Sequence, residues 1–141
     1  MVFDKEFIDK ILEQASKSPR MRQNYDLRNS AADTSQRMMN ALQPGTVVPI
    51  HCHEDTAETV ICLCGKVEEI FYEEDYDFLH EQTSREEEVL RKKCFKETAR
   101  FLLSPQDGLY GIQIPAGTWH TIQVLEPSVI FEAKDGTYIP R

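Results

Sequence analysis

From residue 37 to the end of the chain, short apolar runs alternate with glycine and proline turns. The runs are "MMNALQPGTVVPI", "ETVICLCGKVEEIFY", "LYGIQIP" and "HTIQVLEPSVIFEAKDG". The turn signals stand at Pro44-Gly45, Gly65, 105–108, 115–117, Glu126-Pro127 and Asp135-Gly136. Many short strands broken by glycine and proline are typical of an all-β sandwich or barrel. This pattern excludes a helical bundle and predicts an all-β fold.

The start of the chain has a different periodicity, which predicts one amphipathic α-helix over residues 4–17. Its apolar residues recur at helical spacing on one face: Phe7, Ile8, Ile11, Leu12 and Ala15. Asp4 is placed to cap the helix, and Pro19 disfavours helical geometry at the preceding residue. We expect residues 1–36 to supply this helix and a lead-in strand, and residues 37–141 to form the barrel. A length of 141 residues suits one domain overall.

Residues 73–93, "EEDYDFLHEQTSREEEVLRKK", are strongly charged. Ser84 followed by Glu87 could cap a short helix there. We interpret the segment as a solvated excursion between two strands, with His80 as a surface side chain.

Charge and hydropathy limit the partners. The formal net charge of -8 argues against nucleic acid, because phosphate binding needs a basic face. No stretch approaches the roughly 18 apolar residues of a membrane span. The N-terminus "MVFDKEFIDKIL" lacks the basic and apolar regions of a secretory signal. We therefore expect a cytoplasmic protein with four free thiols, and no membrane partner.

A metal site is predicted from strand geometry. Residues two apart share a face of a strand, so His51 and His53 point the same way. If the strand that begins at Glu58 pairs with them as a hairpin, its carboxylate returns to the pair. His120 opens a later strand, after the turn at 115–117, and can face the hairpin across a barrel. Three imidazoles and one carboxylate suit one divalent transition metal ion, such as Fe, Mn, Ni, Cu or Zn.

The cysteines are predicted to pack rather than to bind metal. Cys62 and Cys64 share the face of Glu58 in a regular strand, but Cys62 lies ~13 Å from it along the strand and Cys64 lies further. Cys52 points away from the histidine pair. None of the four cysteines, of which Cys94 is the last, has the CxxC spacing of a zinc knuckle or redox pair.

At these positions the chain resembles the cupin superfamily. "GTVVPIHCHEDTAETVICLCG" is similar to the first cupin motif, G-x5-H-x-H-x4-E-x6-G, with every spacing kept from Gly45 to Gly65. "PAGTWH" resembles the core of the second motif, P-x-G-x2-H, and ends at His120. The second motif departs from the pattern at Leu109, where a glycine is expected, and at Val124, where an asparagine is expected. These changes affect an interior polar contact and leave the four metal positions intact.

Further segments resemble one cupin subfamily, the WbuC-type cupin-fold metalloproteins. They are "SPRMRQNYDL", "RMMNALQPGT", "ETVICLCGKV", "IPAGTWHTI" and "FEAKDGTY", which together span nearly the whole chain. The resemblance implies a small cupin barrel, that is, a double-stranded β-helix or jelly roll, with a bound metal ion. It also implies a gene near those for surface-polysaccharide synthesis, and it implies no particular reaction.

Candidate ligand-binding residues follow the helix. Arg20, Arg22, Asn24 and Tyr25 could bind an anionic or sugar-like ligand at the barrel mouth, and a surface strand with ordinary salt bridges is an equal alternative. Lys134 shares a strand face with Glu132, so it forms either an ion pair or part of the pocket. Trp119 and Tyr110 are interpreted as core or interface residues. A homodimer is expected, because an open small barrel exposes a strand edge.

Three functions remain open from the sequence, which leaves undecided whether the chain is an enzyme. The first is a metal-dependent enzyme that acts on a small polar, sugar-derived molecule of surface-polysaccharide metabolism, with the ion as Lewis acid. The second is an Fe(II) oxygen-dependent dioxygenase, since two histidines and a carboxylate can hold that ion. The third is a non-catalytic module that binds metal or ligand.

Overall fold

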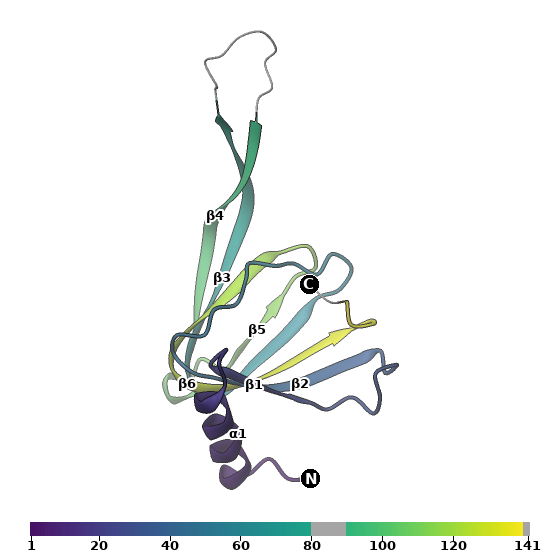
Figure 1. Ribbon diagram of the computed structural model, residues 1–141, viewed down its shortest axis with the longest axis vertical. Helices are drawn as coiled ribbons and strands as arrows, with labels where there is room; N and C mark the ends of the chain where they lie inside the picture. Colours follow the sequence, from purple (N-terminus) through teal and green to yellow (C-terminus); the bar gives the residue numbers. More distant parts are fainter. Residues whose placement is uncertain (80–89, 140–141) are drawn as a thin grey trace.

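A computed structural model describes residues 1–79 and 90–139 of the chain. These residues form one N-terminal α-helix, one short 3-10 helix and six strands (Figure 1). The elements are α1 Lys5–Lys17, β1 Arg22–Asp26, β2 Ser35–Leu42, β3 Glu58–Leu79, β4 Leu90–Leu103, η1 Pro105–Asp107, β5 Gly111–Ile114 and β6 Trp119–Asp135. The prediction of an all-β fold with an N-terminal helix is confirmed. His80 and the helix predicted from Ser84 lie outside the described residues.

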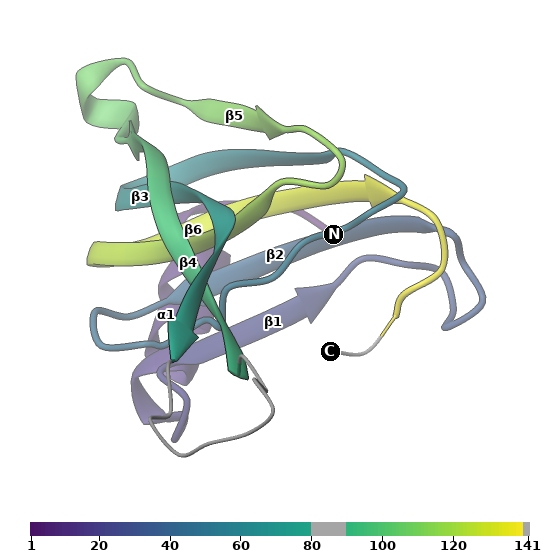
Figure 2. The ribbon, with the colours of Figure 1, turned by 90° about the horizontal axis from the view of Figure 1, so that it is seen from above.

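The strands form one curled antiparallel sheet in the order β1-β2-β6-β3-β4, with β5 also paired to β3. Figure 2 shows β5, β3, β6, β2 and β1 following one another across the molecule. The hydrogen-bonded path ends at β1 and at β4, so over the described residues the sheet curls as a jelly roll without closing into a complete barrel.

A corner in β3 and β6 produces the curl. The two strands pair from Glu58 opposite Lys134 to Tyr72 opposite Trp119, with register shifts between 62 and 67. At the corner Gly65 has a φ of 89°, and a Cβ atom there would overlap Ser128 Oγ and the carbonyl oxygen of the preceding proline. The sequence indicated turns at Gly65 and at Glu126-Pro127, but β3 and β6 stay paired through both sites. Both sites are β-bulges, which bend paired strands without ending them.

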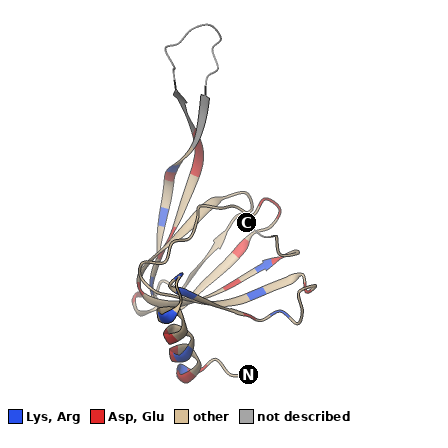
Figure 3. Ribbon diagram, in the orientation of Figure 1, with Lys and Arg blue, Asp and Glu red and all other residues tan. Residues whose placement is uncertain are grey.

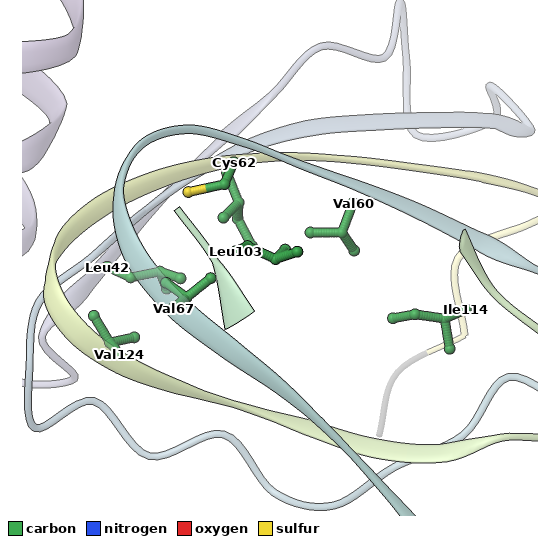
Figure 4. Packing of buried hydrophobic residues seen from close by; sticks show 8 residues of the cluster. Leu42, Val60, Cys62, Val67, Leu103, Ile114 and Val124 are labelled. Atoms are coloured by element: carbon green, nitrogen blue, oxygen red, sulfur yellow. The ribbon is translucent and has the colours of Figure 1, made fainter. Parts of the chain in front are cut away.

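The corner folds the two halves of the β3–β6 pair over a common interior. The buried apolar residues of this interior are Leu42, Val60, Cys62, Val67, Leu103, Ile114, Val124 and Ile130. Figure 4 shows their side chains gathered inside the curl of the strands. Cys62 is 2% exposed, and burial raises the pKa of its thiol to about 11. A thiol that stays protonated is a poor metal ligand, so Cys62 packs as predicted.

Cys64 does not share the face of Cys62, contrary to the prediction. It contacts a second apolar cluster under the helix, because the bulge at the corner breaks the two-residue alternation. This cluster joins Ile11 and Ala15 of α1 to the outer face of β2 and β6.

Helix α1 begins and ends where the sequence predicted. The side chain of Asp4 accepts a hydrogen bond of 2.9 Å from the backbone N–H of Phe7, and Ser18 is extended ahead of Pro19. None of the described helices has the length and apolar character needed to cross a membrane.

Beyond the curled sheet, β3 and β4 continue as a two-stranded ribbon (Figure 1). The register runs from Val67 opposite Leu103 to Leu79 opposite Leu90. The charged segment 73–93 was interpreted as an excursion between strands. Its described part is instead an extension of the strand pair itself.

Candidate metal centre

The histidines are positioned by the start of β6. His51 and His120 exchange backbone hydrogen bonds of 3.0 and 2.9 Å as an isolated β-bridge. The carbonyl oxygen of His53 accepts a hydrogen bond of 2.8 Å from the N–H of Gly117. Residues 51–53 therefore lie against the turn that leads to His120, and alternation along the chain carries both imidazoles to the interior.

Glu58 reaches the histidines by a different route from the predicted one. The sequence predicted a hairpin between the His51–His53 segment and β3, and this was wrong. Glu58 begins β3 and pairs with Ile114 of β5 and Lys134 of β6. The corner at Gly65 then brings this half of the sheet over the half that carries His120. The carboxylate and the imidazoles thus meet across the interior.

The four predicted ligands converge. One ligand atom from each of His51, His53, Glu58 and His120 lies within 4.8 Å of those of the others. The ring centroids of His51 and His120 are 4.2 Å apart, and those of His51 and His53 are 5.1 Å apart. Glu58 and His120 are buried, and the other two are half-buried. The group is therefore open toward one side only.

Backbone carbonyl oxygens fix the tautomers of two of the histidines. The Nδ1 of His51 lies 2.9 Å from the carbonyl oxygen of Pro49, and the Nδ1 of His120 lies 2.9 Å from that of Thr118. A carbonyl oxygen only accepts, so each Nδ1 carries the proton and donates. Each Nε2 then keeps a lone pair for a metal ion, an arrangement typical of ligating histidines.

The carboxylate of Glu58 fits the same role. Its Oε2 lies 3.1 Å from His53 Nε2 and 3.7 Å from His120 Nε2, yet it makes no hydrogen bond of good geometry with the described residues. Burial raises the pKa of Glu58, but His120, His53 and Lys134 outweigh it and hold that pKa well below its usual range. An ionised carboxylate among three imidazole nitrogens is stabilised by a cation that replaces the protons between them, so these residues fit a divalent transition metal ion.

A cavity of about 510 Å³ opens above the four residues. Arg22, Asn24 and Lys134, three of the four predicted ligand-binding residues, line it together with Arg20. Lys134 Nζ lies 3.3 Å from His53 Nε2. Figure 3 shows acidic and basic segments on the strands of the curled sheet.

Tyr25, the fourth predicted ligand-binding residue, lies on the other face of β1. Its ring packs against Phe7 of α1 at 5.2 Å between centroids, and it does not line the cavity. Strand alternation is the reason, because Arg22 and Asn24 face inward and the odd-numbered neighbours face the helix. Trp119, which packs against Phe95 at 4.9 Å, and the exposed Tyr110 do not line the cavity either.

Asn40 and Glu69 are among the polar residues of the cavity wall that were not predicted from the sequence. Glu69 is 3% exposed, and its Oε2 has no hydrogen-bond partner among the described residues. The alternation in "KVEEIFY" places Val67, Glu69 and Phe71 on one face of the strand, but does not say which face is inward. Val67 and Phe71 pack inward, so the residue between them also faces inward.

A family model described as a domain of unknown function, DUF6016, matches residues 3–84. No curated protein matches the chain in sequence.

Solved structures of other proteins resemble this chain over more of its length than the family model does. KdgF from Halomonas sp. is 16% identical with a TM-score of 0.53, over 86% of this chain and 84% of that one. The conserved protein SPY1581 of unknown function from Streptococcus pyogenes is 12% identical with a TM-score of 0.56, over 99% and 90%. The capsular polysaccharide assembling protein CapF from Staphylococcus aureus is 18% identical with a TM-score of 0.53, over 87% of this chain and 30% of CapF. At these identities the likeness establishes the fold alone, and the predicted cupin fold is confirmed. The finer WbuC-type resemblance stays a prediction.

Proposed function

The chain belongs to the DUF6016 family, and from that premise we propose that it is a metal-dependent cupin enzyme acting on a small polar molecule. One observation carries the proposal. Four ligand atoms from His51, His53, Glu58 and His120 converge within 4.8 Å at the base of a cavity of about 510 Å³. Such a cavity is within the usual size of small-molecule sites.

The donor set suits Fe, Mn, Ni or Zn, because imidazole and carboxylate together are borderline in softness. When bound, the ion supplies Lewis acidity to an oxygen of the ligand. The protein residues supply the remaining functions. His51 and His120 are held in one tautomer by backbone carbonyls, and Glu58 remains ionised beside them. The ammonium of Lys134 is placed to bind an anionic oxygen near the centre.

The cavity wall favours an anionic, hydroxylated ligand. Arg20 and Arg22 bring two positive charges to the cavity wall in a chain whose formal net charge is -8. A local positive field in an acidic protein concentrates anions at that place. Arg28 contributes less, since its guanidinium is already paired with Asp26 at 2.8 Å. CapF, which has the same fold, is a capsular polysaccharide assembling protein, and this supports a sugar-derived substrate of surface-polysaccharide metabolism.

Elemental analysis of protein purified without chelator tests the metal. We expect close to one transition metal ion per chain in the wild type and almost none in the His51→Ala, His53→Ala double variant. The Cys52→Ala, Cys64→Ala double variant is the matched control. It removes two thiols close to the histidines in sequence and should keep its metal. Equal metal in wild type and histidine variant would refute the assignment.

Turnover distinguishes the chemistry once a substrate is found. The Lewis-acid function predicts equal rates with and without dioxygen. Rates that vanish under anaerobic conditions would assign an Fe(II) oxygen-dependent reaction to the same residues.

A further inference from the structure

Two further polar residues, Glu69 and Asn40, line the cavity that holds the four metal-ligand candidates. Glu69 stands in β3 opposite Ile122 of β6 and Phe101 of β4. Its carboxyl oxygen Oε2 and the amide oxygen Oδ1 of Asn40 are both buried without a hydrogen-bond partner among the described residues. Both residues line the cavity. Two polar oxygen atoms are therefore desolvated in the wall of a cavity that a ligand can enter.

The fold gains nothing from Glu69. A buried polar group without a partner costs about 1–3 kcal/mol of stability. The inward neighbours on the same strand are Val67 and Phe71, which pack in the apolar core, so a leucine between them would suit the fold better. A residue that breaks a local packing rule in a cavity is a candidate for a role in binding.

The charges around Glu69 determine its protonation. Burial raises the pKa of Glu69 well above its usual range, and the carboxylates of Glu132 and Glu58 raise it further. Glu58, by contrast, is held ionised by the histidines and Lys134. The cavity thus holds carboxyl groups of both kinds, with Glu58 ionised and Glu69 neutral. A neutral carboxyl group donates a hydrogen bond through its O–H and accepts through its other oxygen.

We propose that Glu69 and Asn40 form a hydroxyl-binding subsite, which selects ligands that carry alcohol groups and orients their hydroxylated end inward. The proposal rests on the proposed function and deepens it by naming the ligand class, a hydroxylated carboxylate or related sugar acid. Glu69 donates to one ligand oxygen, and Asn40 Oδ1 accepts from a ligand O–H. Glu132 disfavours anionic groups at this wall, and they pair with Lys134, Arg20 and Arg22 instead.

Two probes of equal chain length test the subsite by calorimetry on the Zn²⁺-loaded protein. Gluconate carries a carboxylate and five hydroxyl groups, and hexanoate carries the carboxylate alone. We expect the wild type to bind gluconate more tightly. Glu69→Leu and Asn40→Leu should each weaken gluconate about ten-fold, the loss expected for one or two hydrogen bonds, and leave hexanoate unchanged. Glu69→Gln keeps a donor and an acceptor and should retain most of the preference.

The control is Glu68→Leu, because Glu68 precedes Glu69 on the strand but pairs with Arg100 at 3.5 Å and does not line the cavity. It should leave gluconate binding unchanged. Glu69→Leu should also unfold at a higher temperature than the wild type and keep its Zn²⁺.

Two results would overturn the subsite. One is a wild type that shows no preference for gluconate over hexanoate. The other is a Glu69→Leu variant that binds gluconate as tightly as the wild type does. If Glu69→Leu does not fold, the Asn40→Leu measurement decides in the same way. If the proposed metal site is wrong, the wild-type protein will contain no metal, and this result is distinct from the two above. Gluconate and hexanoate are then compared on that metal-free protein.

Discussion

Replacing Glu69 by glutamine should change how the stability of this protein depends on pH. In the unfolded chain Glu69 loses its proton near its ordinary pKa of 4.5. In the folded protein, burial and the neighbouring carboxylates of Glu132 and Glu58 raise that pKa well above this value. Between the two pKa values the folded state holds one proton more than the unfolded state.

The sign and size follow from this difference. A raised pKa in the folded state gives a stabilising contribution that is complete below the unfolded pKa and is lost as pH rises toward the folded pKa. The loss is at most about 1.4 kcal/mol for each pH unit, the value for one proton. Glutamine does not titrate, so the Glu69→Gln variant lacks the loss. The free energy of unfolding of Glu69→Gln, relative to that of the wild type, should therefore rise by up to ~1.4 kcal/mol when the pH is raised by about one unit from about pH 5.5.

Urea unfolding at several pH values from about 5 to about 7.5 measures the difference in free energy of unfolding between the variant and the wild type. The single tryptophan, Trp119, lies beside His120 and packs against Phe95, so its fluorescence reports loss of the folded site. The protein is kept metal-free with chelator, because metal binding is itself linked to protons. Glu68→Gln is the control, and its curve should stay parallel to that of the wild type. A Glu69→Gln curve that is also parallel to the wild type would show that Glu69 is ionised in the folded protein.

Metal at about 100 times its Kd should raise the free energy of unfolding of the wild type by about 2.7 kcal/mol, and thermal unfolding of His51→Ala should show no such rise. In urea unfolding, Gly65→Ala should destabilise the protein by several kcal/mol, because the new Cβ atom overlaps Ser128 in the corner. Gly136 has a similar positive φ, but a Cβ atom there meets no other atom. Gly136→Ala should therefore cost only about 1 kcal/mol in the same assay. Equal losses in the two glycine variants would contradict the role of the corner. Asp4→Ala should cost about 1 kcal/mol in the same assay, since it removes the helix cap, and an unchanged midpoint would contradict this.

The sequence predicted which four residues converge, because motif spacing is a property of the chain itself. The path that joins the ligands was not predictable in the same way. Gly65 was taken for a turn because glycine permits both turns and bulges, and only the pairing partner of the strand distinguishes them. The same bulge moved Cys64 to the helix side of the sheet.

Strand alternation was more informative than composition. Tyr25 was grouped with Arg22 and Asn24 because of its polar hydroxyl group, yet alternation places it on the opposite face. Glu69 was overlooked among the many acidic residues of the chain. Its inward position depends on the register after the corner, which the sequence alone did not provide.

The corner at Gly65 also determines which residues of β3 face the interior on either side of it. Before the corner, even-numbered residues of β3 face the interior, as Glu58 and Cys62 do. After it, odd-numbered residues do, as Val67 and Glu69 show. If the bulge is kept, deleting one residue at the corner would leave Glu58 in place and put Glu68 and Ile70 into the inward positions of Val67 and Glu69. The number of residues at the corner is therefore more important than most of their identities. A change of one residue changes which side chains of β3 face the four metal-ligand candidates.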